Sequence, residues 1–527
     1  MTSRRRAAAP GVVLGLLAAL LLSGCGVFGS SATSAGGGAS SSASPTLAPR
    51  PVQRRAVAPQ PAADLRGFYR QKLDWKPCRK AQECSVLRVP LDYAHPTAGA
   101  ISISVLRQPA LDRRARLGSL VVNPGGPGAS GVDYAAGATA VFGEAVRKVY
   151  DVVGFDPRGV GASTPIECGT GRQLDALVHS DPDPRTRAER ATSDRLLHGL
   201  GESCLRDSGA LARHVSTIEV ARDMDILRAA LHDTRLTYFG ASYGTFIGAT
   251  YANIFPTRVG RMVLDGALNP ASSTLEVGLV QAHGFEVALR AYVGACVARG
   301  SCFLGSTVDQ GVARIGELLR QTEAHPIRAA NGRELTGGDA VYGVWQPLYA
   351  KTLWPILDRA LQNAFQGDGS LLLAVADSYL HRDSRGNYLD NTFEAFNAIN
   401  CLDRDDGVPS SRVARYLPRF EKASPTFGGI FASGMSACTV WPVHSGRQPA
   451  PVRAVGSPPI MVVGTSRDPA TPLVWARALA RQLPHGVLVT RDGDGHTGYR
   501  RGSPCTDDAV ERYLVSGTVP RHDLRCS

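Results

Sequence analysis

Residues 236–245 read Leu236-Thr-Tyr-Phe-Gly-Ala-Ser-Tyr-Gly-Thr245 and place Ser242 at the centre of a G-x-S-x-G pattern. A short apolar run leads into the first glycine, and a helix-like stretch at 245–253 follows the pattern. This order of strand, turn and helix is the one in which a sharp turn exposes a serine hydroxyl at the end of a sheet. Small residues beside the serine let the backbone pass close to its neighbours. The pentapeptide also fits an ordinary turn between a strand and a helix, so its meaning depends on the rest of the chain.

Apolar runs typical of β-strands alternate with helical patterns on both sides of Ser242. Residues 85–93 and 100–108 are two alternating runs separated by Pro and Gly, which predicts a β-hairpin. We also predict a helix at 217–231 and four short strands at 117–122, 150–155, 236–239 and 259–264. This alternation predicts the α/β class, with a mostly parallel sheet flanked by helices. Ligand sites in such sheets lie beyond the carboxyl ends of the strands, where the glycine-rich turns of this chain fall.

The pattern changes between residues 269 and 453, where strand-like runs almost vanish. Helical periodicity is found instead, at 279–299, 308–324 and 353–365. Two strand-like runs then return, at 460–464 and 486–490, and a helical pattern at 473–483 lies between them. A crossover between neighbouring parallel strands needs only about a dozen residues. We therefore interpret 269–453 as a large, mainly helical cap inserted into a core made of 65–268 and 454–527; an independent second domain is the alternative.

The C-terminal part of the chain supplies the two residues that a serine nucleophile needs. A serine hydroxyl requires a base to take its proton, and the base requires a carboxylate to orient it. Asp468 lies just after the first of the returning strands, and His496 lies in the glycine-rich loop after the second. Both should emerge on the same side of the sheet as Ser242. Asp265, which follows the strand after Ser242, is an alternative orienting acid.

Acyl transfer also needs hydrogen-bond donors for the oxyanion of the tetrahedral intermediate. One donor is expected to be the backbone N–H of Tyr243, the residue after the nucleophile. The other should come from the glycine-rich loop 123–128, which follows the strand at 117–122. Pro127 carries no N–H, so Gly125 or Gly126 is left as the donor.

The chain resembles the prolyl-aminopeptidase branch of the α/β hydrolases in the Asp468 and His496 loops and in three motifs: P-G-G-P-G at 124–128, D-P-R-G at 156–159 and G-A-S-Y-G at 240–244. The HGGPG motif of prolyl iminopeptidases appears here with Pro124 in place of His, which is similar to the exported tripeptidyl aminopeptidases of bacteria. The resemblance covers residues 65–527. It implies an α/β-hydrolase fold and the removal of short peptides, often tripeptides, from free N-termini through an acyl-enzyme.

An aminopeptidase must bind the ammonium group of its substrate, which calls for acidic side chains near the site. Glu394 and Asp403, in the predicted cap, are the candidates, and a solvated acidic loop is the alternative interpretation. Two other functions stay open: a carboxylesterase or lipase on the same fold, and a non-catalytic binding module. The complete Ser-Asp-His set argues against the binding module. We expect the reaction to need no metal and no organic cofactor.

The N-terminus predicts export. Three arginines at positions 4 to 6 precede a 12-residue apolar run at 11–22, which is well below the ~20 residues of a membrane-spanning helix. Leu22-Ser-Gly-Cys25 then resembles the processing site of bacterial lipoproteins, so 1–24 is a predicted signal peptide and Cys25 a predicted lipidation site. An ordinary secretory signal is the alternative. Residues 25–64 are rich in Ser, Ala, Gly and Pro and are interpreted as a flexible tether. The expected location is the outer face of the bacterial cell membrane, with some protein released.

The cysteine count agrees with export. Apart from Cys25 there are ten cysteines, an even number that is typical of disulfides in an oxidising compartment. The sequence does not define their connectivity. Pairing of sequential neighbours is preferred: Cys78–Cys84, Cys168–Cys204, Cys296–Cys302, Cys401–Cys438 and Cys505–Cys526. No CxxC pair and no His/Cys cluster with metal-ligand spacing is present.

The chain is basic, with a formal net charge of +12 that falls to +9 when the three arginines of the signal peptide are removed. The arginines are scattered, and no nucleic-acid recognition motif is found. We interpret the charge as a solvated surface suited to an anionic cell envelope. The expected partners are peptide or protein N-termini as substrates and, through the lipid, the membrane.

Overall fold

A computed structural model of the protein describes residue 49 and residues 62–527. The predicted signal peptide, the lipidation site Cys25 and most of the predicted tether lie outside these described residues. No helix within the described residues is long and apolar enough to cross a membrane.

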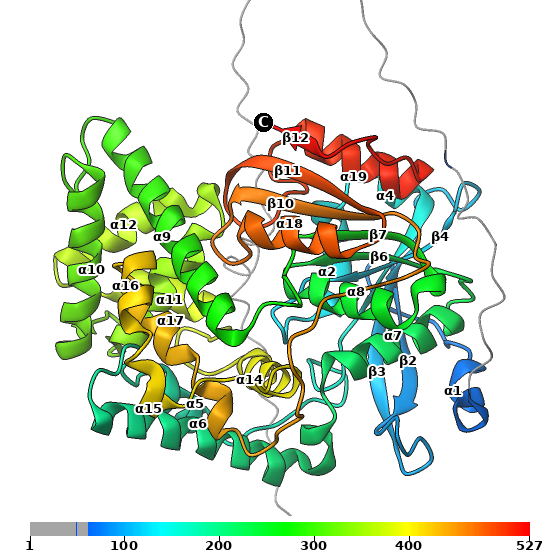
Figure 1. Ribbon diagram of the computed structural model, residues 1–527, viewed down its shortest axis with the longest axis horizontal. Helices are drawn as coiled ribbons and strands as arrows, with labels where there is room; N and C mark the ends of the chain where they lie inside the picture. Colours follow the sequence, from blue (N-terminus) through cyan, green and yellow to red (C-terminus); the bar gives the residue numbers. More distant parts are fainter. Residues whose placement is uncertain (1–48, 50–61) are drawn as a thin grey trace, which may run out of the picture. The chain divides into compact units, whose positions relative to one another are not determined.

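A ten-stranded sheet forms the centre of residues 62–527, with the strand order β1-β2-β3-β5-β4-β6-β7-β10-β11-β12 (Figure 1). The strands are β1 (Lys76–Arg79), β2 (Gln82–Pro90), β3 (Ala100–Gln108), β4 (Gly118–Asn123), β5 (Tyr150–Phe155), β6 (Leu236–Ala241), β7 (Val259–Asp265), β10 (Ile460–Arg467), β11 (Gly486–Asp494) and β12 (Leu524–Cys526). The first three strands are antiparallel to their neighbours, and β2 and β3 form the predicted hairpin. From β5 to β12 in this strand order, each strand is parallel to the next. The predicted α/β class with a mostly parallel sheet is confirmed.

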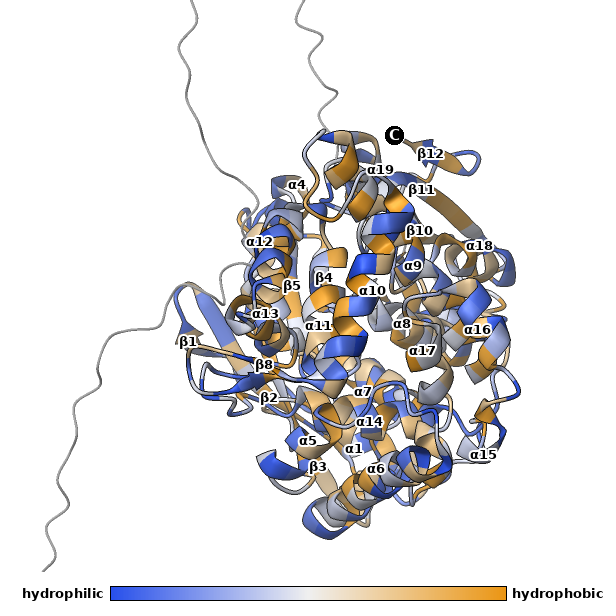
Figure 2. Cartoon of the chain, turned by 90° about the vertical axis from the view of Figure 1, so that its left-hand side faces the viewer, coloured by the Kyte–Doolittle hydropathy of each residue, from blue (hydrophilic) through white to orange (hydrophobic). Residues whose placement is uncertain are grey.

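Helices cover both faces of the sheet because alternate strand residues point to opposite sides. Val121 of β4 packs with one group of helices, α7 (Thr217–Ala230), α8 (Tyr243–Ile254) and α18 (Leu473–Gln482). Its neighbours Leu120 and Val122 pack with the other group, α2 (Gly131–Ala136), α4 (Glu144–Val149) and α19 (Pro504–Ser516). Strands β4 to β7 are therefore buried along their whole length, as expected of strands covered on both faces. In Figure 2, β5 has the hydrophobic colour, whereas β1, at one edge of the sheet, is mostly hydrophilic in colour.

The chain between β7 and β10 is mainly helical, and we call residues 269–453 the cap. Its helices are α9 (Thr274–Ala298), α10 (Val308–Ala324), α11 (Gly337–Leu348), α12 (Trp354–Phe365), α13 (Ser370–Tyr379), α14 (Thr392–Asp403), α15 (Ser410–Val413), α16 (Leu417–Ala423) and α17 (Gly428–Gly434). A two-stranded ribbon, β8 (Ile327–Arg328) and β9 (Glu334–Leu335), accompanies them. Helices α9 to α12 share a hydrophobic core of their own, with Leu289, Ile315 and Leu357 fully buried.

Several elements go beyond the sequence prediction. Helices α5 (Gly171–Val178) and α6 (Arg187–Ser208) lie between β5 and α7 and were not predicted. Over its 22 residues, α6 buries only four, so it offers almost no apolar stripe to detect. The short helices α1 (Arg66–Tyr69) and α3 (Ala138–Val141) carry equally little pattern. Strand β11 continues past the predicted end at residue 490, because Asp494 pairs with Arg467 of β10 in the strand register. The side chains of these two residues also form an ion pair of 2.6 Å.

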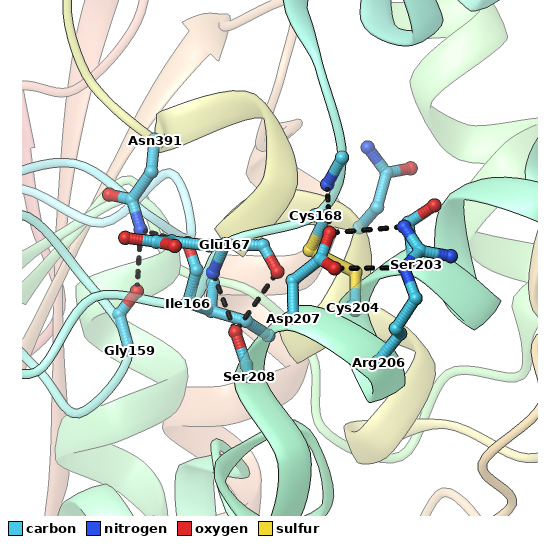
Figure 3. Close-up of a disulfide and its surroundings, with 12 residues drawn as sticks. Gly159, Ile166, Glu167, Cys168, Ser203, Cys204, Arg206, Asp207, Ser208 and Asn391 are labelled. Atoms are coloured by element: carbon cyan, nitrogen blue, oxygen red, sulfur yellow. Dashed lines mark hydrogen bonds and ion pairs between the residues drawn. A yellow bond between two sulfur atoms is a disulfide. The ribbon is translucent and has the colours of Figure 1, made fainter.

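Disulfides pair the ten described cysteines with their sequential neighbours, Cys78–Cys84, Cys168–Cys204, Cys296–Cys302, Cys401–Cys438 and Cys505–Cys526. The bond from Cys168 to Cys204 ties the loop after β5 to α6 (Figure 3). Asn391, directly before the cap helix α14, reaches the same loop: its amide donates to the carbonyl oxygens of Gly159 (2.8 Å) and Ile166 (2.9 Å). The start of α14 is therefore fixed on the core.

Candidate active site

Ser242 lies on a sharp turn between β6 and α8. Its backbone has φ 54° and ψ −125°, a conformation that is strained for any residue with a side chain. The turn is held because Ser242 N donates to the carbonyl oxygen of Asp265 at 2.8 Å. A side chain at Gly240 would lie 2.4 Å from the carbonyl oxygen of Gly244, and one at Gly244 would lie 2.6 Å from that of Asn123. Only glycine fits at either position, which explains the G-x-S-x-G pattern.

His496 and Asp468 are hydrogen-bonded to each other at the carboxyl ends of β11 and β10. The Nδ1 atom of His496 lies 2.9 Å and 3.0 Å from the two carboxylate oxygens of Asp468. Asp468 is 2 % exposed and is held by backbone N–H groups of Ala470, Thr471 and Thr497 at 2.8 to 3.0 Å. A carboxylate with this many donors is fixed in place, so it orients the imidazole ring.

Asp265, the alternative acid, has a different partner in the structure. Its two carboxylate oxygens accept hydrogen bonds from the backbone N–H groups of Gly498 (2.7 Å) and Tyr499 (2.9 Å). Burial raises the pKa of Asp265 to about 6. Asp265 therefore holds the loop that follows His496, while Asp468 contacts the imidazole itself.

The histidine and the serine lie at the same edge of the sheet. A side chain at Gly266 would lie 3.3 Å from Cε1 of His496. Gly266 directly follows Asp265, whose carbonyl oxygen holds the backbone N–H of Ser242. The imidazole thus lies over the end of β7, and β7 is the neighbour of the strand that ends at Ser242.

The loop 124–128 carries two candidate oxyanion donors, the N–H groups of Gly125 and Gly126, and these differ in their hydrogen bonds. The N–H of Gly125 already donates to Oδ1 of Asn123 at 2.9 Å. Among the described residues, no acceptor is found for the N–H of Gly126. Tyr243 is the first residue of α8, and N–H groups in the first turn of a helix have no acceptor within the helix. Gly126 and Tyr243 are therefore the pair of N–H groups left for an oxyanion.

The side chain of Tyr243 makes a contact with the cap. Its hydroxyl donates to the carboxylate of Asp403 and lies 2.8 Å from the hydroxyl of Thr217. The other carboxylate oxygen of Asp403 accepts the backbone N–H of Thr217 at 2.8 Å. Asp403 is buried, and burial raises its pKa. Of the two predicted amine-binding acids, Asp403 thus has both oxygens occupied by the protein.

Glu394, the other predicted amine-binding acid, is in a different situation. It lies in the first turn of α14, beside Thr392, whose hydroxyl donates to the carbonyl oxygen of Gly128 at 3.2 Å. Oε2 of Glu394 is buried and has no hydrogen-bond partner among the residues that the structure describes. Burial raises the pKa of Glu394 to about 7. A buried carboxylate oxygen without a partner makes the charged form of the group costly unless a cation binds beside it.

Two residues at the site were missed by the sequence analysis. Thr471 donates to Asp468 at 3.0 Å, and its hydroxyl lies 3.2 Å from Nδ1 of His496. Tyr349 directly follows the cap helix α11. Its backbone carbonyl oxygen accepts a hydrogen bond from the backbone N–H of His496 at 2.8 Å, and its ring meets the imidazole edge-on, with the two ring centroids 5.2 Å apart. The turn after Asp468 offered a local signal for Thr471, since Asp side chains often accept N–H groups two and three residues on. No signal in the sequence pointed to Tyr349.

Among the described residues, no group of three or more potential metal ligands lies at this site. Within residues 62–527, Asp92, His214 and Glu219 form the one group close enough to share an ion. His214 already contacts Glu219 at 2.9 Å, and the guanidinium of Arg158 lies 3.6 Å from the same carboxylate. This charge pattern is that of a partly buried ion-pair network.

The mostly parallel sheet, the strained serine turn and the Asp-oriented histidine at one sheet edge define the class of this protein, a hydrolase of the α/β fold. Its sequence is 36 % identical over 480 residues to serine protease Hip1 of Mycobacterium tuberculosis (strain ATCC 25618 / H37Rv), covering 86 % of this chain and 91 % of that protein. The chain belongs to the family of α/β hydrolases that includes serine protease Hip1.

Two further relatives lie in the same family. Carboxylesterase B of Mycobacterium tuberculosis (strain ATCC 25618 / H37Rv) is 35 % identical over 469 residues, covering 86 % of this chain and 89 % of that protein. Tripeptidyl aminopeptidase of Streptomyces lividans is 31 % identical over 481 residues, covering 87 % of each chain. The pattern of the family described as "TAP-like protein" matches residues 424–526. This match includes Asp468 and His496, whereas Ser242 lies outside it.

Proposed function

We propose that the protein is a serine aminopeptidase that releases short peptides from free N-termini through an acyl-enzyme. The observation that carries the proposal is the hydrogen bond between Asp468 and His496 at the sheet edge where Ser242 is held on its turn. Relatives named serine protease Hip1 and tripeptidyl aminopeptidase support the choice of peptide substrates.

The proposed mechanism uses these side chains in sequence. His496, oriented by Asp468, takes the proton of the Ser242 hydroxyl, and the serine oxygen attacks the scissile carbonyl carbon. The N–H groups of Tyr243 and Gly126 stabilise the oxyanion of the tetrahedral intermediate. His496 then gives its proton to the leaving amine as the C–N bond breaks. Water, activated by the same imidazole, finally hydrolyses the ester bond to Ser242.

Glu394 is proposed to bind the substrate ammonium. Its oxygen Oε2 lacks a partner in the free protein, and an ammonium group would supply both the charge and the hydrogen bonds that the buried carboxylate needs. Its helix begins against the loop that carries Gly126, so Glu394 lies on the part of the cap that borders this loop. Asp403 is a weaker candidate because Tyr243 and Thr217 already occupy its oxygens.

The proposal is tested with tripeptide and single-residue chromogenic amides, each with a free and an acetylated N-terminus. We expect the wild-type protein to prefer free amines. Glu394→Gln should lower kcat/KM for the free amines about 10- to 100-fold, the worth of a hydrogen bond to a charged group, and should leave the acetylated amides unchanged. Because its pKa is raised to about 7, Glu394 becomes ionised between about pH 6 and 8. The kcat/KM of the wild type should therefore rise between about pH 6 and 8, until the substrate α-amine loses its proton near pH 8.

The matched control is Glu317→Gln, because Glu317 is an exposed cap residue that contacts only Arg320 and Gln321 among the described residues. It should leave both substrate sets unaffected. Equal loss of kcat/KM for free and acetylated amides in Glu394→Gln would refute the ammonium site. Turnover of a butyrate ester without any amide hydrolysis would establish the second candidate, a carboxylesterase, which the relative named carboxylesterase B supports.

We further propose that the protein is exported and anchored to the outer face of the cell membrane through a lipid on Cys25. The lipobox-like Leu22-Ser-Gly-Cys25 supports this location. We expect the wild-type protein to partition into the detergent phase of Triton X-114 and to carry the mass of the lipid. Cys25→Ala should move it to the aqueous phase, while Ser41→Ala in the tether should not. An unmodified Cys25 in the exported wild type would contradict the anchor.

A further inference from the structure

We propose that Asp403 is a positioning residue of the oxyanion hole: through its hydrogen bond to the Tyr243 hydroxyl, the cap holds the oxyanion donor of the core in place. The inference rests on the proposed function, because it assigns Tyr243 N–H a role in the reaction. It makes contact between α14 and the core a condition for fast turnover.

Tyr243 is held in place mainly by its side chain. Its backbone N–H is the candidate donor, and the residue is the first of α8, directly after the strained Ser242. A helix residue at this position has few backbone constraints of its own, since its N–H has no acceptor within the helix. The buried side chain supplies constraints instead, through the bonds from its hydroxyl to Asp403 and Thr217.

Asp403 is buried among groups that favour its ionised form. Its side chain is 4 % exposed, and Nη1 of Arg447 lies 3.5 Å from Oδ1. Oδ1 also accepts the N–H of Thr217, the first residue of α7, where the helix dipole favours a negative charge. These partners favour the ionised carboxylate and so oppose the effect of burial, which raises the pKa of Asp403. A charged acceptor makes a stronger bond to the Tyr243 hydroxyl than a neutral one would.

Helix α14 contacts both halves of the oxyanion hole. Its first residue, Thr392, contacts Gly128 in the loop that carries Gly126, and its last residue, Asp403, contacts Tyr243. Ile399, between these ends, lines a small cavity together with Gly125, Gly128 and Tyr243.

The helix is itself anchored near each end. Asn391 binds the core loop at Gly159 and Ile166, and the disulfide from Cys401 to Cys438 lies beside Asp403. A helix fixed in this way sets the distance between the two donors. A shift of about 1 Å at a reacting group can cost on the order of a hundredfold in rate.

Tyr243→Phe is the sharpest test because it removes only the hydroxyl and leaves the ring and the backbone N–H. We expect kcat to fall about 10- to 100-fold with KM changed less than threefold, a partial loss relative to removing an oxyanion donor outright. The kcat of Asp403→Ala should fall as far. Asp403→Asn keeps a hydrogen-bond acceptor, so its kcat should recover part of the loss. The affinity for a peptidyl boronate, whose adduct places an oxygen in the oxyanion hole, should fall in parallel with kcat/KM.

The matched controls are Tyr292→Phe and Asp358→Asn. Tyr292 donates to Asp358 at 2.6 Å inside the cap, so these variants remove the same kind of bond without touching the site. They should keep the wild-type kcat, KM and boronate affinity. If they lose kcat as far as Tyr243→Phe does, the effect is general loosening of the cap and the inference is wrong.

Other outcomes separate this inference from the proposed function. Wild-type kcat in both Tyr243→Phe and Asp403→Asn would overturn the positioning role while leaving the peptidase intact. A rise in KM for free amines alone, with kcat unchanged, would show that Asp403 binds the substrate ammonium instead. Absence of any amide hydrolysis by the wild type would remove the proposed function first.

Discussion

Replacing Ser242 by alanine is expected to lower kcat by a factor on the order of 10⁶, the loss seen when the nucleophile of a serine protease is removed. The physical reason is that the acyl-enzyme can no longer form. The Ser242 hydroxyl lies on the strained turn beside the carboxyl end of β7, where the imidazole of His496 also lies. Burst kinetics with a chromogenic amide and labelling by a fluorophosphonate both report directly on the serine oxygen.

The fold should survive this change, since the side chain of Ser242 makes no hydrogen bond that the structure describes and its backbone N–H still reaches Asp265. Circular dichroism and Tm therefore serve as the control. Thr245→Ser is the comparison variant on the same turn, because the serine keeps the hydroxyl that donates to the Ser242 carbonyl oxygen at 2.6 Å. Retention of full turnover by Ser242→Ala would end the proposal of a serine nucleophile.

Replacing Asp468 by asparagine should lower kcat by a factor of about 10⁴, as it does when the buried acid of such a triad is neutralised. An amide cannot stabilise the imidazolium that forms when His496 accepts the serine proton, and its NH₂ group favours the wrong tautomer of the ring. Substrate binding does not use this carboxylate, so KM should change little. The measurement is kcat and KM across the pH range, with fluorophosphonate labelling as an independent readout of serine reactivity.

The comparison with Asp265→Asn makes this prediction specific. Asp265 uses both oxygens to accept backbone N–H groups of Gly498 and Tyr499, so asparagine there leaves one donor unpaired and should lower Tm. Its loss of kcat should be much smaller than that of Asp468→Asn, because Asp265 does not contact the imidazole. A reversed order, with Asp265→Asn the more severe, would assign the orienting role to Asp265.

Most strands of the central sheet and several helices were predictable because their signals are local. Hydrophobic periodicity identified β5 at Tyr150–Phe155, and the same reasoning identified α10 at Val308–Ala324. Helix α6 escaped prediction because it packs few apolar residues and is stabilised by its position over the core and by the Cys168–Cys204 bond. Propensity within a segment does not report such distant contacts.

The residues of the candidate site also fall into those that the sequence predicts and those that it does not. Asp468 and His496 were found because each follows its own strand, and the carboxyl ends of neighbouring parallel strands meet at one edge. Asp403 was expected at the substrate ammonium but lies on Tyr243, and Tyr349 was not expected at all. Both contacts join residues more than a hundred positions apart, so they depend on where the cap lies over the core.

The amino-acid sequence alone determined the α/β architecture and the order of serine, aspartate and histidine along the chain, because period-two and helical patterns and glycine-rich turns act over a few residues. Only the tertiary structure decided which acid orients His496, which glycine N–H is free for the oxyanion and which cap carboxylate lacks a partner. These outcomes depend on hydrogen-bond saturation and burial. Both are properties of the packed molecule, created when segments distant in the chain exclude water from one another.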